Sequence, residues 1–329
     1  MRTHLDVNAA LPGLPPTTDQ PVVQTRDLSK RYGRVQALDR VTLSVPPGCT
    51  GLLGPNGAGK STLIKLLLGL LRPNGGEARL VGYDATHQPL ALRAIVGYMP
   101  EHDCLPGDWV AQDFVQYMGE LHGLPKRVAI ERASDMLYLV RLGEERYRAI
   151  RGFSTGMKQR VKLAQALVHD PRIMLLDEPT NGLDPAGRDE MLALIRRITD
   201  EMGIDVVVSS HLLADIQQVA AYVVILSNGH VVVQGDLRSL EMAKPSVTVR
   251  THADAAALAG ALRSRGYQVQ EDGHELQVEY SSSDIYDAIR DAAVETHSAL
   301  VHLKRRVLSL EDIYLDSQVR ANADSSEPL

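Results

Sequence analysis

This chain of 329 residues has only two cysteines, and it lacks long apolar runs and a surplus of positive charge. Its two cysteines, Cys49 and Cys104, match no metal-binding spacing and fit a reducing compartment. The longest apolar stretches, Leu63 to Leu71 and Val219 to Leu226, fall well short of the roughly 20 residues that a membrane-spanning helix needs. The first residues lack the continuous apolar segment of a secretory signal. The sequence therefore predicts a chain that neither crosses a bilayer nor carries such a signal.

Lys and Arg number 35 against 41 Asp and Glu, so the formal net charge is −6, and no basic run occurs along the chain. This balance predicts no general attraction to nucleic acid, and no nucleic-acid partner is expected. Apolar residues make up 44% of the chain and charged residues 23%. Such a composition and length indicate a globular protein with one large domain and one small one.

The order of apolar patterns predicts where the domains lie. Residues 1–20 are rich in proline and read as a flexible leader. Over residues 21–242, short runs typical of strands (CTGLLG, RIMLLD, IDVVVSS, YVVIL) alternate with segments of helical period, which predicts an α/β domain with a largely parallel sheet. Residues 243–318 predict a small α+β domain, for which a ferredoxin-like fold is one candidate and a regulatory or dimer-supporting role is favoured. Residues 319–329 are polar and predict a disordered tail.

The clearest motif is GPNGAGKS, Gly54 to Ser61, which matches the P-loop pattern between an apolar run and a helical segment. Its glycines let backbone N–H groups turn toward phosphate oxygens, and the start of the helix adds a partial positive charge. Lys60 is predicted to reach the β and γ phosphates, and the Ser61 hydroxyl to be a ligand of Mg²⁺. The motif by itself predicts nucleotide binding and no particular reaction.

Two carboxylates follow the apolar run IMLL further along the chain. Asp177 is predicted to hold Mg²⁺ through its water shell, and Glu178 to polarise the attacking water. An apolar run that ends in Asp-Glu is common, but together with a P-loop it predicts hydrolysis of the nucleotide.

These motifs resemble the nucleotide-binding subunits of ATP-binding cassette (ABC) transporters over roughly residues 22–240. FSTGMKQR, from Phe153, is similar to the family signature, which contacts ATP bound by the opposite subunit. It departs from the common form LSGGQ, notably at Thr155, whose bulk affects the strength of that contact, but it keeps Ser154 and Gly156.

Further family motifs lie in the expected order. The resemblance places Glu101 at the Q-loop glutamine, near Mg²⁺ or the lytic water, and Asp184 in the D-loop that couples the two sites. It places His211 at the switch histidine, which contacts the γ-phosphate and Glu178. Tyr32 would stack on adenine, with Val35 against the base or ribose. The implied nucleotide contacts of the P-loop are Gly54, Asn56, Gly57, Ala58, Gly59, Lys60, Ser61 and Thr62.

The resemblance implies a P-loop NTPase fold with a RecA-like core, an antiparallel β subdomain and a helical subdomain at about residues 102–165. It also implies ATP and Mg²⁺ as ligands, and a homodimer or pair of ATPase subunits that closes on ATP. Such subunits lie peripherally at the cytoplasmic face of the cell membrane, joined to separate transmembrane permease subunits. The Glu-containing Q-loop, the S-x-G-M-x-Q-R signature and the C-terminal LSLEDIYL are similar to the ABC-2 exporter subfamily.

Two other functions remain open. A soluble ABC ATPase that acts on the ribosome or on DNA usually has two cassettes in tandem or a long coiled-coil insertion, whereas this chain has one copy of each motif. A regulatory nucleotide sensor would be expected to lack residues such as Lys60, Glu178 and His211, which are present. The transported compound is not encoded in these motifs.

Overall fold

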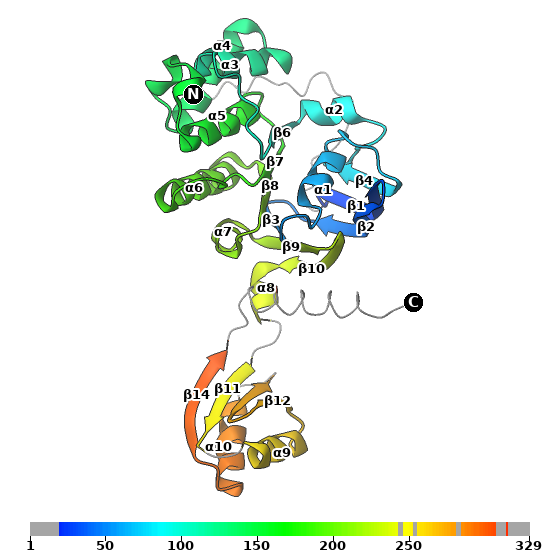
Figure 1. The fold of residues 1–329 in the computed structure, drawn as a ribbon, viewed down its shortest axis with the longest axis vertical. Helices are drawn as coiled ribbons and strands as arrows, with labels where there is room; N and C mark the ends of the chain where they lie inside the picture. Colours follow the sequence, from blue (N-terminus) through cyan, green and yellow to red (C-terminus); the bar gives the residue numbers. More distant parts are fainter. Residues whose placement is uncertain (1–19, 243–245, 253–254, 281–283, 307–313, 315–329) are drawn as a thin grey trace. The chain divides into compact units, whose positions relative to one another are not determined.

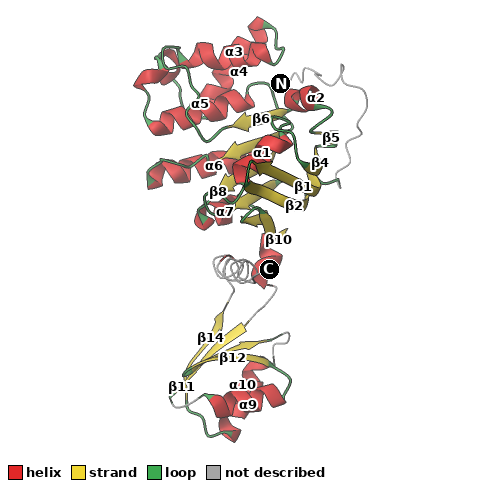
Figure 2. Cartoon of the chain, turned by 45° about the vertical axis from the view of Figure 1, so that its right-hand side comes forward, coloured by secondary structure: helices red, strands yellow, loops and turns green. Residues whose placement is uncertain are grey.

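The computed structural model describes residues 20–242, 246–252, 255–280, 284–306 and 314. The predicted leader, except residue 20, and the predicted tail lie outside these residues, as does most of LSLEDIYL. The chain divides into two compact units, one made of Met1–Tyr222 and Leu226–Val231, the other of Val223–Ile225 and Val232–Leu329. Figures 1 and 2 show the elements of each.

An antiparallel sheet with the order β2-β1-β4-β5 forms one part of the first unit. A tight turn at Gly33, whose φ is +57°, joins β1 to β2 and pairs Tyr32 with Val35. The strands are β1 (Val23–Tyr32), β2 (Val35–Val45), β4 (Gly75–Leu80) and β5 (Tyr83–Asp84).

The second sheet has six strands in the order β10-β9-β3-β8-β7-β6, and the pairs β3–β8, β8–β7 and β7–β6 are parallel. Every residue of β3 and β7 is buried, as expected for parallel strands that are covered on both faces and therefore read as continuous apolar runs. The strands are β3 (Cys49–Leu53), β6 (Val96–Met99), β7 (Ile173–Asp177), β8 (Asp205–Ser210), β9 (Tyr222–Ser227) and β10 (His230–Asp236).

Helices cover this sheet on both sides. Figures 1 and 2 show α1 on one side, where it contacts β2, β4 and β7, and α6 and α7 on the other, where they contact β8. Helices α3, α4 and α5 contact one another, and α5 also contacts the edge strand β6. The helices are α1 (Lys60–Leu67), α2 (Pro89–Ala94), α3 (Ala111–Leu121), α4 (Lys126–Leu139), α5 (Thr155–Leu167), α6 (Pro185–Met202), α7 (Leu213–Val219) and α8 (Leu237–Met242), with 3₁₀ turns η2 (Glu145–Tyr147) and η3 (Ile150–Gly152).

The second unit contains a four-stranded antiparallel sheet in the order β12-β13-β11-β14. Its element order, β-α-β-β-α-β, is that of a ferredoxin-like fold. Residues that alternate along β11 and β13, such as Val247, Val249 and Leu276, form one apolar core with the two helices. The elements are β11 (Ser246–Thr251), α9 (Ala256–Ser264), β12 (Gln268–Asp272), β13 (Glu275–Glu279), α10 (Ile285–Glu295) and β14 (Leu300–Arg306).

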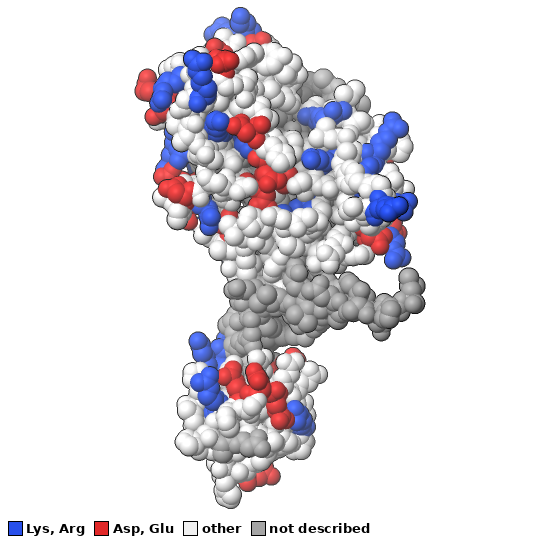
Figure 3. Space-filling view, viewed as in Figure 1, with Lys and Arg blue, Asp and Glu red and all other residues white. Residues whose placement is uncertain are grey.

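Among the described residues, no helix combines the length and the apolar character needed to span a membrane. On the face drawn in Figure 3, lysine and arginine side chains are interspersed with aspartate and glutamate in both units. The charge is therefore mixed in sign over that face.

Candidate functional site

The sequence-predicted residues converge because several loops leave the parallel sheet at the same edge. The register pairs Leu53 of β3 with Ser210 of β8, and Asp177 of β7 with Ser209 of β8. β6 is aligned with β7 through Met99 and Leu176. The loops after β3, β6, β7 and β8 therefore begin side by side at the carboxyl ends of the strands, where open α/β sheets bind ligands.

The loop after β3 has the backbone geometry of a phosphate cradle. Gly57 and Gly59 have φ values of +84° and +105°, which favour glycine, and a Cβ added to Gly59 would lie 2.6 Å from the Ala37 carbonyl oxygen. Leu63 N donates to Gly59 O, so α1 begins here, and its first N–H groups have no intrahelical acceptor. Exposed glycine backbone and a helix start together favour an anion.

Lys60, Glu178 and His211 form a compact cluster beside this loop. The buried Lys60 Nζ donates to Gly54 O at 2.7 Å and lies 3.2 Å from Glu178 Oε1. His211 Nδ1 lies 2.9 Å from Glu178 Oε2. Within the described part of the chain, Glu178 Oε1 is buried and has no hydrogen-bond partner beyond this ion pair with Lys60. Glu178 also has a φ of +49°, a left-handed conformation that a glutamate rarely adopts and that is often found at active sites.

Asp177 and Ser61 bring oxygen atoms together across 116 residues of sequence. Ser61 Oγ donates to Asp177 Oδ1 at 3.2 Å. A hydroxyl and a carboxylate this close are suitable donors for a hard cation such as Mg²⁺, which keeps water molecules in its remaining positions. The residues present therefore fit this ion.

Ser209 is a site residue that sequence reasoning missed. Its hydroxyl donates to Asp177 Oδ1 at 2.7 Å and accepts a hydrogen bond from Glu178 N at 2.9 Å, so one buried side chain contacts the carboxylate of Asp177 and the backbone of Glu178. Its only sequence signal is a polar residue near the end of an apolar strand, two positions before His211.

A cavity of about 340 Å³ is lined by P-loop residues and by Glu178. Glu101, from the loop after β6, lines it together with Glu178 and the P-loop. Tyr32 lies on the β1–β2 hairpin, where its ring is 46% exposed and 5.3 Å from the Lys30 ammonium. The lining residues are Val35, Gln36, Ala37, Pro55, Asn56, Gly57, Gly59, Lys60, Ser61, Thr62, Glu101 and Glu178.

Ser154, Gly156 and Asp184 line a different cavity, of about 660 Å³. Ser154 is the N-cap of α5 and Asp184 the N-cap of α6, each accepting a hydrogen bond from a backbone N–H three residues on. Thr155 lies against Gly182, where an added Cβ would be 3.2 Å from Thr155 Cγ2, so the extra bulk at Thr155 occupies space left by a glycine. The structure thus separates the predicted residues into two groups on one chain.

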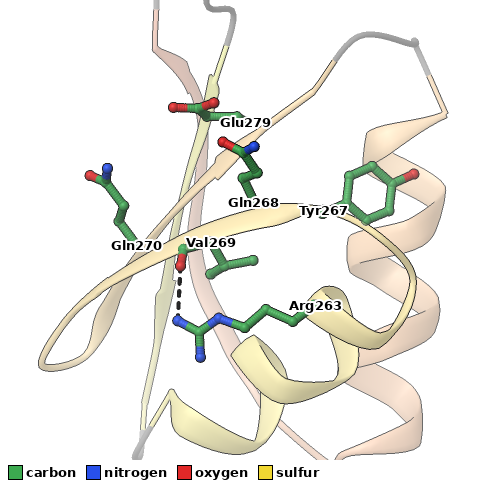
Figure 4. A pocket seen from close by; sticks show the side chains of 6 residues that line it. All are labelled: Arg263, Tyr267, Gln268, Val269, Gln270 and Glu279. Carbon is green, nitrogen blue, oxygen red and sulfur yellow. Dashed lines mark hydrogen bonds between the residues drawn. The ribbon is translucent and has the colours of Figure 1, made fainter.

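A third cavity, of about 380 Å³, lies in the second unit and contains none of the sequence-predicted site residues among the described residues that line it. Figure 4 shows Arg263 on one side of the β12 ribbon and Gln268 and Glu279 on the other. Arg263 is already engaged, since it donates to Val269 O at 2.8 Å and to Glu271. The cavity therefore offers no converging set of free polar groups in the described part of this unit.

Comparison with known proteins gives a family match within the first unit and relatives that match most of the chain. The profile of the ABC transporter family matches residues 38–181. The uncharacterized ABC transporter ATP-binding protein YxlF of Bacillus subtilis is 34% identical over 298 residues, covering 89% of this chain and 98% of the relative. The daunorubicin/doxorubicin resistance ATP-binding protein DrrA of Streptomyces peucetius is 32% identical, covering 89% of this chain and 90% of the relative.

Solved structures agree in fold. An ATP-binding subunit of an ABC transporter has a TM-score of 0.61 at 30% identity, covering 68% of this chain and 92% of that one. The dimeric post-hydrolysis state of the ATP-binding cassette MJ0796, bound to ADP and Pi, has a TM-score of 0.60 at 24% identity, covering 66% and 99%.

Proposed function

We propose that this chain, which belongs to the ABC transporter ATP-binding proteins, powers an exporter whose membrane-spanning part is a separate subunit. The family is one of ATP hydrolases. Export is supported by relatives whose names refer to resistance to daunorubicin and doxorubicin, to bacitracin transport and to Nod factor export. The relatives differ in the compounds they are named for, so the cargo is not assigned.

The reaction is phosphoryl transfer to water, and Glu178 carries the argument. Glu178 Oε1 is buried next to the P-loop, where it is paired with the Lys60 ammonium at 3.2 Å and has no hydrogen-bond partner in the described chain. It can therefore accept a hydrogen bond from the attacking water and orient it. His211 Nδ1 lies 2.9 Å from the other oxygen of Glu178, and His211 would contact the γ-phosphate. Lys60 and the loop N–H groups neutralise charge on the phosphates.

Ser61 and Asp177 would hold Mg²⁺, with Glu101 facing the same cavity. Bound there, the ion would neutralise charge on the β and γ phosphates. Ser209 keeps Asp177 and Glu178 in fixed relative positions through its two hydrogen bonds. Val35 would contact the base or ribose from the β1–β2 hairpin, and Tyr32 would stack on adenine.

The two separate groups of residues support a site shared by two ATPase subunits. Ser154, Gly156 and Asp184 line their own cavity, apart from the lining of the P-loop cavity. We infer that they complete the ATP site of a second subunit, in a homodimer or a pair of different ATPases, and that ATP closes the dimer. The chain would act at the cytoplasmic face of the membrane, with permease subunits as partners.

The experiment compares ATP turnover by the wild type and Glu178→Gln, which keeps the shape of the side chain but removes the base. Turnover is expected to fall by at least ~100-fold while ATP affinity stays within a few-fold, because loss of a general base affects the chemical step. Glu201→Gln, an exposed carboxylate on α6, is the matched control. Equal turnover by Glu178→Gln and the wild type would contradict hydrolysis at this site.

The partner is tested by affinity purification from detergent-solubilised membranes. Recovery of a multi-span membrane protein would support the exporter. Co-purification with ribosomes would instead support a soluble ABC ATPase.

A further inference from the structure

Helix α5 and the turn that follows it are attached to the edge strand β6 by a row of polar side chains. Gln165 Nε2 donates to Tyr98 O at 2.8 Å, and His169 Nε2 lies 3.2 Å from Val96 O. The acceptors recur every second residue, as carbonyls on one edge of a strand do, and the side chains facing them come from α5 and from the turn directly after it. β6 lies at the end of the six-stranded sheet, so these side chains satisfy carbonyls that have no neighbouring strand.

Gly97 allows the helix to approach the strand closely. A Cβ at this position would lie 2.3 Å from Ala166 O, which is a backbone atom and cannot rotate away. The strand and the helix backbone are therefore in direct contact, and the polar side chains on either side of this point act over short distances.

Lys162 continues the row beyond the end of the strand. Its ammonium donates to Pro100 O at 2.7 Å, Glu101 O at 3.0 Å and His102 O at 3.4 Å. The residue is 3% exposed, and this burial lowers the pKa of Lys162. A buried ammonium that donates to three successive carbonyls fixes the backbone at Glu101, because all three hydrogen bonds share one donor group.

The side chain of Glu101 is connected to α5 by a second route. Gln159 Nε2 donates to Asn181 O at 3.1 Å, and Asn181 Nδ2 lies 3.5 Å from Glu101 Oε1. Gln159 and Lys162 are three residues apart and so lie on the same face of α5. Helix α5 therefore contacts the Glu101 backbone directly, through Lys162, and the Glu101 side chain indirectly, through Gln159 and Asn181.

We propose that Lys162 is a positioning residue that joins the Glu101 loop to α5 as one rigid body. Ser154 caps the start of the same helix, so a movement of α5 shifts Ser154, which serves one ATP, and Glu101, which serves the other. The positions of Ser154 and Glu101, which belong to two different ATP sites, then change together. This inference rests on the proposed function, since it assigns Glu101 and Ser154 to two ATP molecules.

The test is Lys162→Met, which removes the ammonium and keeps much of the side-chain length. We expect ATP affinity within about two-fold of wild type and kcat reduced by about ten-fold or more, because displacement of a positioned group by about 1 Å can cost 10²-fold in rate. The Mg²⁺ concentration for half-maximal turnover should rise. Lys162→Gln, which retains N–H donors, should recover part of kcat.

The matched control is Arg151→Met. Arg151 pairs with Asp108 at 3.0 Å beyond the Glu101 loop, but both side chains are exposed, so its removal should leave kcat unchanged. If Lys162→Met does not fold, Gln159→Leu removes the second connection and should show the same selective loss of kcat.

Folded Lys162→Met with wild-type kcat and Mg²⁺ dependence would overturn the inference, as would an equal loss in Arg151→Met. In the fallback case, wild-type kcat in Gln159→Leu would overturn it. An inactive wild type would instead contradict the proposed function.

Discussion

Glu101 brings a negative charge into a cavity that already holds Glu178 and lies over Ser61. Its backbone is held by Lys162, and its Oε1 lies 3.5 Å from Asn181 Nδ2. An amide at this position would keep an oxygen atom and the size of the side chain but lose the charge. The two residue types should therefore differ mainly in their attraction for a cation.

Glu101→Gln is accordingly expected to hydrolyse ATP at a rate within a few-fold of wild type but to need several-fold more Mg²⁺. A nearby unit charge in a partly exposed site contributes on the order of 1 kcal/mol to cation binding, hence the several-fold effect. A Mg²⁺ titration of turnover at saturating ATP measures this. Glu131→Gln, an exposed carboxylate on α4, controls for net charge. Superimposable titrations would remove the role assigned to Glu101.

At the scale of elements, the contact of β6 with the turn after α5 includes a buried histidine, His169. The ring of His169 stacks on His122 with centroids 3.8 Å apart, and Nε2 faces the Val96 carbonyl, so Nε2 carries the proton. Nδ1 is buried without a hydrogen-bond partner in the described chain. Burial, with the His122 and Arg132 charges, lowers the pKa of His169 from 6.5 to about 3.

The contribution of His169 to the free energy of unfolding should therefore decrease as pH falls below 6.5. Between pH 6.5 and about 3 the unfolded chain binds a proton at His169 that the folded chain does not, so this residue removes up to about 1.4 kcal/mol per pH unit. His169→Gln keeps a donor to Val96 and should lose this component. Urea unfolding from pH 7.5 to 4.5 measures it: the stability curves of wild type and variant should converge as pH falls. Parallel curves would contradict the assignment.

At the scale of the whole molecule, the second unit has a core of its own. Val249 on β11 is fully buried in an apolar cluster that consists of residues from this unit. Thr248, the preceding residue, points to the opposite face of the strand and is half-buried. Neighbouring positions on one strand thus offer a buried site and a matched partly exposed one.

Val249→Asp is expected to unfold the second unit while ATP binding by the first changes less than about two-fold. An isolated buried carboxylate costs several kcal/mol, which is a large share of the stability of a small domain. Calorimetry should show the loss of one unfolding transition, and Thr248→Asp should retain it. A parallel loss of ATP binding would show that the first unit depends on the second.

The comparisons confirm the family and the α/β fold that the motifs predicted. The motifs could be read because each is local: Gly54 to Ser61 combines backbone freedom, a helix start and a lysine within one short segment. The domain boundary near residue 243 and the roles of the individual site residues stay predictions. Glycine-rich loops and strand ends can be recognised in sequence, but a role at a site depends on what faces each side chain.

The amino-acid order by itself determined the apolar strands β3, β7, β8 and β9, the helix start after the P-loop, and the types of residue that suit phosphate and a hard cation. These properties depend on neighbouring residues and on periodicity. The tertiary structure alone decided that Ser209 joins the Asp177 carboxylate to the Glu178 backbone, that Lys162 reaches the carbonyls at Glu101, and that Ser154 lies in a cavity apart from the P-loop. These contacts join segments that are distant in sequence, such as Ser61 and Asp177 at 116 residues, and the register of the parallel sheet brings them together.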